Sequence, residues 1–531
     1  MLILSPLVWL IASALLVFRL LFSLRSRRPK GTQDLPGPSG LPWIGSVFDL
    51  NKGEGGYFWF KFTEWSKQFG PIYQYKTFGK INVVVNTEKM ANDLLRERGE
   101  FYSSRESLPM ASQLLSDGYK ALFLPYGEKW RRVRKLQHHV TQVNAANSYQ
   151  PLQQHESARM VNDLVSNPGE YKTLFRRYAS ALILRLTYGI EVQTGNEDIV
   201  RLVYENQLNV ERVSAPGQYL VDVLPILMWL PTWLAPFKQE AKAHRTREVN
   251  LFSSLVKGVE QDIEAGKAGP SFTRTWLENK EKWALEDLQG IYVLGGLYSA
   301  AASTTASLAT SWLLMMVLHP EWFQKLQAQI DEVVGPDRLP RYDDLPNLPL
   351  LRAVAKEVAR MRPVTAGGIA HKSTQDDTYN GYFIPKGSII HPNLWAIHHD
   401  PQLYPDPFTF NPDRWLSPDF PTTYKEPLTK YPNMNNFSVF GFGRRLCPGG
   451  HIAERSIYIL SARMAWACNI EKATDPKTGA PITPPEYNYV KALNTEPHPF
   501  PFQLECRSEK HREVLQREAR EASEALSSGS R

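Results

Sequence analysis

A single cysteine among glycines and arginines is the part of this sequence with the clearest chemistry. Cys447 lies within residues 440–450, which read FGFGRRLCPGG, and an apolar helical pattern follows directly. Cysteine binds a metal as the thiolate, which is favoured by nearby cations and by the backbone N–H groups at the start of a helix. The residue types therefore predict a metal-binding thiolate. The alternative is a glycine-rich turn whose buried cysteine acts as a small apolar side chain.

Four neighbours of Cys447 fit a thiolate that binds a flat metal-containing ligand. Gly443 and Gly449 allow tight turns and a close approach of the main chain to that ligand. Arg445 carries forked donors that suit a carboxylate. Phe440 would cover the sulfur side with an apolar wall.

These residues carry a resemblance to a known family. The fixed positions of the pattern F-x-x-G-x-R-x-C-x-G are all filled, by Phe440, Gly443, Arg445, Cys447 and Gly449. The chain thus resembles the cytochrome P450 family at its haem-thiolate motif. The resemblance covers residues 34–506 and implies one mainly α-helical domain with small β-sheets. It also implies haem b, with Cys447 as the axial ligand of the iron.

Two further motifs resemble haem-propionate partners of that family. Trp130 and Arg134 are four residues apart in a helical pattern, so they share one helix face. They match W-x-x-x-R, which implies that both side chains reach one haem propionate. The resemblance assigns His371 to a propionate as well. Without it, the basic helix would be an ordinary solvated face, and His371 an ordinary core or surface residue.

A charge cluster is expected near the cysteine loop. Glu357 and Arg360 stand one helical turn apart, a spacing that in most proteins marks an exposed pair of small effect. They resemble the family's E-x-x-R motif, and Arg414 lies where its third member is expected. The resemblance therefore implies a buried cluster of Glu357, Arg360 and Arg414. Buried charges persist only when they are paired.

A long apolar helical pattern without internal proline covers residues 288–318. Residues 300–305, AAASTT, resemble the oxygen-activation motif A/G-G-x-D/E-T-T, with Thr304 as the candidate hydrogen-bond partner of dioxygen. Ser303 stands where the family has an acid, and Ala301 where it has glycine. A serine hydroxyl relays a proton but does not titrate near neutral pH. The alternative is that these hydroxyls only bond back to the preceding turn.

The composition narrows the possible partners. The 531 residues carry a formal net charge of +7 that is not gathered into long basic runs, which gives no support for nucleic-acid binding. The three cysteines are too few and too scattered for a disulfide framework, so the folded part is expected to face a reducing compartment. Strands are expected at residues 72–75 and 81–85, which are rich in β-branched and aromatic side chains.

The chain divides into four parts along its length. Residues 1–24 are predicted to be a membrane anchor, since residues 2–18 are uncharged and apolar. Positive charge follows in residues 25–42, a basic and proline-rich hinge. This order of charge favours an anchor over a cleaved signal, and it predicts that the catalytic part lies on the cytoplasmic side. Residues 43–506 would be the catalytic domain. The charged tail, residues 507–531, is expected to be a frayed helix or disordered.

The substrate is expected to be lipophilic. Residues 219–237 are strongly apolar but contain three prolines, which favours a monotopic membrane contact or core packing over a spanning helix. By resemblance, the segments around the substrate are also apolar and contain several aromatic residues. They suit a mid-sized compound of a specialised pathway, such as a polyketide, terpenoid or indole alkaloid.

The resemblance implies a monooxygenase in the membrane of the endoplasmic reticulum. Two electrons are needed, and the chain has no glycine-rich nucleotide loop after a strand. A separate NADPH-dependent flavoprotein reductase is therefore implied, docking near Lys129, Arg131 and Arg444, with cytochrome b5 as a further candidate partner. Two alternatives remain. One is a haem-thiolate isomerase or dehydratase, suggested by Ser303, and the other is a non-catalytic haem carrier.

Overall fold

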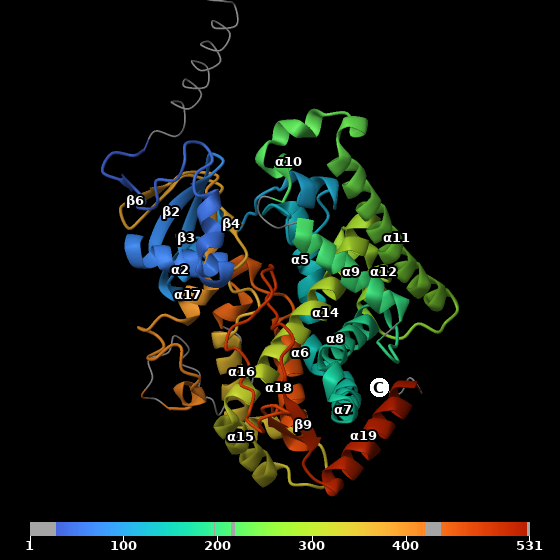
Figure 1. The fold of residues 1–531 in the computed structure, drawn as a ribbon. Coiled ribbons are helices and arrows are strands. Elements are labelled where there is room, and N and C mark those ends of the chain that lie inside the picture. Colours follow the sequence, from blue (N-terminus) through green and yellow to red (C-terminus); the bar gives the residue numbers. More distant parts are fainter. Residues whose placement is uncertain (1–27, 196, 214–217, 418, 420–436, 528–531) are drawn as a thin grey trace, which may run out of the picture.

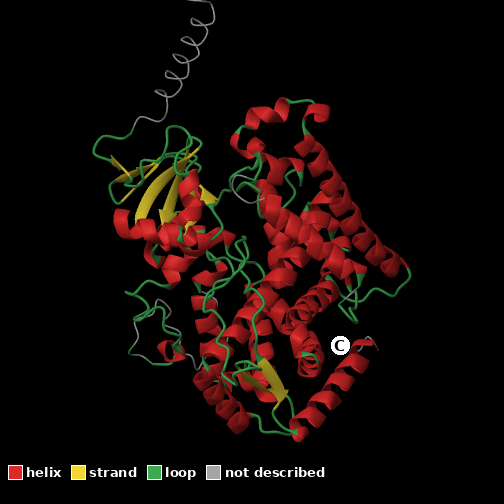
Figure 2. Ribbon diagram, viewed as in Figure 1, coloured by secondary structure: helices red, strands yellow, loops and turns green. Residues whose placement is uncertain are grey.

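Helices form most of the molecule (Figures 1 and 2). The computed structural model describes residues 28–195, 197–213, 218–417, 419 and 437–527. The helices up to residue 264 are α2 (Phe58–Phe69), α3 (Glu88–Asn92), α4 (Gly99–Tyr102), α5 (Glu128–Thr141), α6 (Val143–Ser148), α7 (Gln150–Ser166), α8 (Tyr171–Tyr188), α9 (Asp198–Val213), α10 (Leu220–Val223) and α11 (Pro236–Glu264). They continue with α12 (Phe272–Leu277), α13 (Lys280–Trp283), α14 (Asp287–Leu318), α15 (Pro320–Val333), α16 (Pro349–Met361), α17 (Leu394–His398), α18 (Gly450–Ala467) and α19 (Glu509–Ser527).

Three small sheets complete the fold. The largest joins β2 (Ile72–Thr77), β3 (Lys80–Val85), β7 (Ile389–Pro392) and β4 (His371–Lys372) in that order. A second sheet has the order β1 (Gln33–Asp34), β6 (Tyr382–Ile384), β5 (Asp377–Tyr379), and a third pairs β8 (Cys468–Glu471) with β9 (Gln503–Cys506). The two strands predicted from β-branched residues are thus present as β2 and β3. The prediction of a mainly helical fold with small sheets is confirmed.

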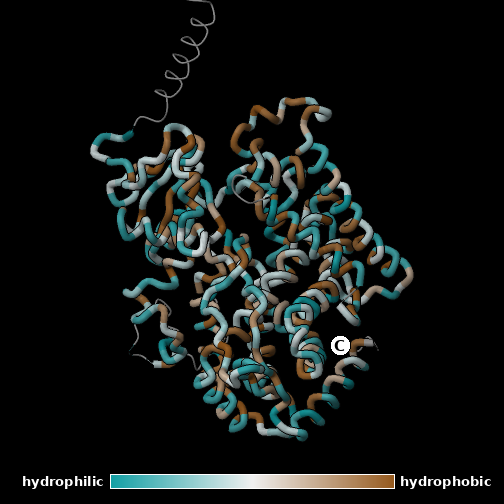
Figure 3. The backbone as a smooth tube through the Cα atoms, viewed as in Figure 1, coloured by the Kyte–Doolittle hydropathy of each residue, from teal (hydrophilic) through white to brown (hydrophobic). Residues whose placement is uncertain are grey.

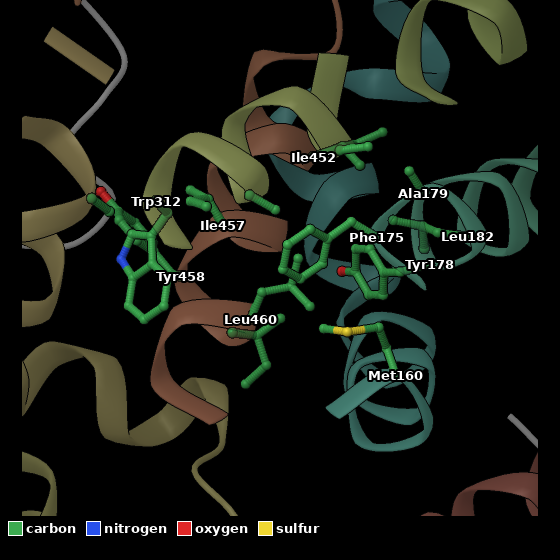
Figure 4. Packing of buried hydrophobic residues seen from close by; sticks show 14 of the residues in the cluster. Met160, Phe175, Tyr178, Ala179, Leu182, Trp312, Ile452, Ile457, Tyr458 and Leu460 are labelled. Atoms are coloured by element: carbon green, nitrogen blue, oxygen red, sulfur yellow. The ribbon is translucent and has the colours of Figure 1, made fainter. Parts of the chain in front are cut away.

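The core lies where α14 packs along α8 and α18, and α7 packs against both α8 and α18. Figure 4 shows this packing, with Trp312 on α14, Phe175 and Tyr178 on α8, and Ile457 and Leu460 on α18. All five side chains are almost fully buried. The helix that carries Thr304 and the helix that follows Cys447 are therefore held in one rigid apolar unit.

α14 is also the one helix in the described ranges that is long and apolar enough to cross a membrane. Most of its apolar window is buried inside the molecule, as expected for the central helix of a large domain. The predicted anchor, residues 1–24, lies outside the described residues. The hinge is described from residue 28, and its residues Gln33–Asp34 pair in parallel with β6.

The expectation of a frayed or disordered tail is wrong for Glu509–Ser527, which form α19 and pack against α7. Leu515, Ala519, Ala522 and Leu526, spaced three to four residues apart, are buried along one face, and Val514 is buried beside Leu515. Arg507 pairs with Asp331 at 2.6 Å just before the helix. The apolar stripe is narrow, and the many charged residues of the tail made it difficult to recognise in the sequence. A helix with such a stripe becomes stable only when the stripe packs against another helix.

Candidate active site

Cys447 lies in a short loop between the 3-10 turn η11 (Gly443–Arg445) and α18. Its backbone N–H donates to the carbonyl oxygen of Phe440 at 2.9 Å. Gly443 has φ +55°, and a Cβ there would lie 2.1 Å from the carbonyl oxygen of Leu95. Glycine is therefore required at position 443 by the left-handed backbone of the turn and by the close approach of the Leu95 carbonyl group. At Gly449, by contrast, a Cβ would meet nothing within 4 Å among the described residues.

The thiol of Cys447 is accessible even though protein surrounds the loop. Burial raises the pKa of Cys447, whereas hydrogen bonds from the N–H groups of Gly449 and Gly450 and the charge of Arg134 lower it. The N–H groups at the start of α18 thus point at the sulfur, as the sequence predicts for a thiolate. A metal ion would deprotonate the thiol outright.

α14 presents a stripe of small residues that other side chains leave open. Gly296 and Ala300 are exposed and Thr304 is half-buried, although most of the helix is buried. The Thr304 hydroxyl donates to the carbonyl oxygen of Ala300 at 2.8 Å. Thr304 therefore makes the hydrogen bond to the preceding turn that was expected if its hydroxyl had no role in oxygen activation. This bond uses its hydrogen and leaves the oxygen lone pairs as acceptors.

Ser303 faces a second space, on the side of α14 that packs toward α8 and α9. Its Oγ atom is buried and has no hydrogen-bond partner among the described residues. A cavity of about 140 Å³ opens beside it. Three arginines, Arg176, Arg177 and Arg201, line this cavity together with uncharged residues, and no carboxylate does.

A cluster of cations lies near Cys447, and it includes a residue that the sequence did not single out. Burial and the neighbouring Arg105 and Arg134 lower the pKa of Arg445 to about 8. Burial lowers the pKa of Arg105 to about 9, and burial with the charge of Arg105 lowers that of His371 well below its usual value. In the described part of the chain, no carboxylate pairs with Arg105, Arg134 or Arg445. Positive charge is therefore left unbalanced there.

The hydrogen bonds of the cluster run mostly to the backbone. Arg445 donates to the carbonyl oxygens of Ser103 at 2.7 Å and Ala121 at 3.3 Å, and its guanidinium lies 4.5 Å from the ring centre of Trp130. Arg105 donates to the carbonyl oxygen of Ile369 at 2.9 Å, while its buried Nε has no hydrogen-bond partner among the residues that the structure describes. These two arginines tie together four chain segments, those around residues 104, 121, 369 and 445. They also keep spare donors for an anion.

Glu357, Arg360 and Arg414 come together as a buried cluster. Glu357 binds Arg360 through both carboxylate oxygens, each at 2.8 Å, and accepts from Arg414 at 3.0 Å. Burial alone would raise the pKa of Glu357, but the two arginines and the N–H of Asn411 lower it below its usual value. Trp415 donates to the same carboxylate at 2.9 Å. The cluster fixes α16 to the segment η9 (Pro412–Trp415).

The described residues fit a haem with two propionates. The accessible thiol of Cys447, the open stripe of α14 and the carboxylate-free cation cluster supply a ligand, a flat wall and anion donors. Arg105 was missed from the sequence because its only signal is one basic residue between Ser104 and Glu106. His371 is held beside the cluster by its Nδ1 atom, which lies 2.7 Å from the carbonyl oxygen of Tyr102.

Comparison with known proteins agrees with this geometry. Residues 35–483 match the family model for cytochrome P450. Cytochrome P450 monooxygenase 253 of Postia placenta is 36% identical over 87% of this chain and 86% of its own, and cytochrome P450 monooxygenase virE of Hypocrea virens is 33% identical over 93% and 88%. A zebra fish cytochrome P450 structure with progesterone has the same fold, with a TM-score of 0.69 at 23% identity over 85% of this chain and 99% of that chain. This chain therefore belongs to the cytochrome P450 family.

Proposed function

We propose that this protein is a haem-thiolate monooxygenase that inserts one oxygen atom from O2 into a lipophilic small molecule. The observation that carries the proposal is the accessible Cys447 thiol under the N–H groups of Gly449 and Gly450. The fungal relatives named as monooxygenases support it. We place the substrate in a specialised metabolic pathway, as suggested by the apolar segments that the family resemblance assigns to the substrate.

Each residue of the site then has a distinct task. A haem bound through a cysteine thiolate supplies electron density that favours cleavage of the O–O bond. Arg105, Arg134 and Arg445 would hold the propionates, since these cations have no carboxylate partner among the described residues, and His371 lies beside them. Phe440, whose ring packs against Gly450, shields the thiolate loop.

Proton delivery would run through the two hydroxyls of α14. Thr304 can accept a hydrogen bond because its own hydrogen is held by Ala300. Ser303 can take a proton from water in the cavity beside it and pass one on, because its Oγ is not otherwise engaged. No acid stores the proton there, so the route depends on water.

The Thr304→Ala variant tests this assignment. Loss of the acceptor oxygen should uncouple NADPH oxidation from product formation, with product per NADPH falling about tenfold or more, as for loss of a proton-transfer group. The measurement compares NADPH consumed, peroxide released and product formed by the protein reconstituted with its reductase. Unchanged coupling would remove Thr304 from proton delivery.

The Ser303→Asp variant is the matched comparison. A carboxylate at 303 would meet the arginines of the cavity and restore a titratable group beside Thr304. Turnover should rise if the missing acid limits proton supply. A fall in turnover would mean that the cavity has adapted to the smaller side chain.

We further propose a microsomal arrangement, with the catalytic domain cytoplasmic and reductase bound on the basic side of α5. Arg131 and Arg444 both lie over the ring of Tyr126, at 5.8 and 5.1 Å from its centre, so two cations from distant segments share one surface. Lys129 lies nearby over Tyr119 at 4.1 Å. Such a surface suits an acidic flavoprotein or cytochrome b5.

We also propose a membrane contact, formed by the apolar segment 219–237. Its exposed side chains include Leu220, Ile226, Trp229, Trp233 and Leu234, and Figure 3 shows the segment as a hydrophobic arc at one end of the molecule. Strand β6 lies toward the same end (Figure 1). Leu41, Trp43 and Phe48, in the segment between β1 and α2, are exposed as well. We infer that this end rests on the endoplasmic reticulum membrane.

Double substitution Trp229→Ser and Trp233→Ser, in protein that begins at residue 28, should weaken vesicle binding about tenfold, because two largely exposed aromatic anchors are lost. Cosedimentation with phospholipid vesicles measures this. Phe408→Ser, at an aromatic residue that is also exposed, is the matched control. Equal binding of both variants would contradict the membrane contact.

One observation favours a second function. Ser303 in place of an acid would suit an isomerase or dehydratase that needs no proton delivery to oxygen. That enzyme would turn over its substrate without NADPH or reductase, whereas the monooxygenase requires both.

A further inference from the structure

Two of the three cysteines face each other across a pair of strands. In the antiparallel sheet of β8 and β9, Cys468 is the direct register partner of Cys506. The next pair on the same face is Ile470 with Leu504, and both of those side chains are buried. Direct partners of an antiparallel pair project to the same side of the sheet. The two thiols therefore lie side by side at the end of the sheet.

The hydrogen-bond pattern brings the two cysteines into the closer of the two possible spacings. The N–H of Arg507 donates to the carbonyl oxygen of Ala467 at 3.0 Å, so the neighbouring pair is hydrogen-bonded. Hydrogen-bonded and non-hydrogen-bonded pairs alternate, which makes Cys468 and Cys506 a non-hydrogen-bonded pair with Cα atoms about 4.5 Å apart. Disulfides span Cα distances of about 4.4 to 6.8 Å. The pair can close without moving either strand.

The two thiols differ in access. Cys506 is half-buried, and its thiol lies 3.5 Å from the carbonyl oxygen of Ser508, whereas Cys468 is fully buried. Burial, together with the nearby Cys506, raises the pKa of Cys468, so that it rests as the thiol. An oxidant from solution therefore reaches the thiol of Cys506 first. Cys468 can react only afterwards, with the oxidised form of Cys506.

We propose that Cys468 and Cys506 are a redox-active pair that closes into a cross-strand disulfide when a peroxide oxidises the protein. In the first step the thiolate sulfur of Cys506 attacks hydrogen peroxide: the O–O bond breaks, an S–O bond forms, and water leaves after protonation. In the second step the sulfur of Cys468 displaces the hydroxyl from Cys506, forming the S–S bond and a second water. Two thiols lose two electrons, and one peroxide gains them.

The position of the pair links it to the rest of the fold. Cys468 directly follows α18, the helix that begins beside the Cys447 loop, and Cys506 leads into α19. A disulfide would therefore join the end of α18 to the segment that carries the C-terminal helix. In a reducing compartment the pair rests as two thiols, so the link would be reversible.

Peptide mapping of the haem-loaded protein tests the proposal. The protein is treated with hydrogen peroxide, free thiols are blocked with iodoacetamide, and trypsin digestion proceeds without reductant. Residues 464–472 and 492–507 should appear as one linked peptide, lighter by two hydrogen atoms than their sum, and dithiothreitol should separate them. Cys447, in the peptide of residues 446–455, serves as the internal comparison and should stay outside the link.

Two variants sharpen the result. Cys468→Ser should leave Cys506 without its partner, so that the same peroxide dose carries it on to the sulfinic and sulfonic acids. The double variant Cys506→Ser with Leu504→Cys moves the thiol two residues along the same face and should lower the yield of linked peptide severalfold. The proposal is overturned if Cys506 is over-oxidised equally with and without Cys468, or if the link forms only in urea-unfolded protein.

Discussion

The Cys447→Ser variant is expected to lose the spectrum of a thiolate-bound haem and its oxygenase activity. In the native protein, reduction with dithionite and addition of carbon monoxide should give a strongly red-shifted Soret band. Serine keeps the size of the side chain but cannot supply a thiolate at neutral pH. Activity should fall by more than about 100-fold, because loss of an outer-shell partner alone costs about 10- to 100-fold.

The two other cysteines provide matched controls for that result. Cys468→Ser and Cys506→Ser remove thiols of the same chemistry from the sheet of β8 and β9, away from the loop before α18. Both should keep the thiolate spectrum. Retention of that spectrum in Cys447→Ser, or its loss in either control, would overturn the assignment of the ligand. Absence of any haem band in the native protein would overturn the haem site itself.

Glu357→Gln should be the most destabilising single substitution in the chain outside the haem site. The carboxylate pairs with two arginines, and the three side chains are at most 1% exposed. A neutral amide would leave Arg360 and Arg414 as buried charges without an anion, at a cost of about 3 to 5 kcal/mol in the free energy of unfolding. Urea or thermal unfolding of the haem-loaded protein measures the loss, and poor haem loading is expected alongside it.

A surface pair with the same helical spacing is the control. Glu64 pairs with Lys61 at 2.7 Å, but its side chain is 48% exposed. Glu64→Gln should cost at most about 1 kcal/mol, since exposed pairs contribute little. If the two substitutions had equal effects, the buried cluster would not be what holds α16 in place.

The same cluster makes stability depend on pH in a defined direction. The pKa of Glu357 in the folded protein lies below its usual value of 4.5, so the folded state binds this proton less readily than the unfolded state. The contribution of Glu357 is therefore complete above that value and declines as the pH falls below it. Unfolding curves of the native protein and of Glu357→Gln should differ less as the solution becomes more acidic.

Much of the site could be predicted from the sequence because its parts are local. The loop around Cys447 depends on residues at fixed offsets within the ten positions from Phe440 to Gly449, and the bond from the N–H of Cys447 to Phe440 closes it. Helix α14 follows from an unbroken apolar pattern, and its ends fall within one residue of the predicted range. Glu357 and Arg360 meet because a helix brings residues three apart onto one face.

Only the tertiary structure decided contacts between segments far apart in the chain. It joined Arg105 to the cluster of Arg134, Arg445 and His371, although nothing near Arg105 marks it as an anion donor. It also turned the charged tail into a packed helix, because a narrow apolar stripe is stable only against a partner surface. Residue types and short spacings determine what a side chain can do, whereas packing of distant elements determines what it meets.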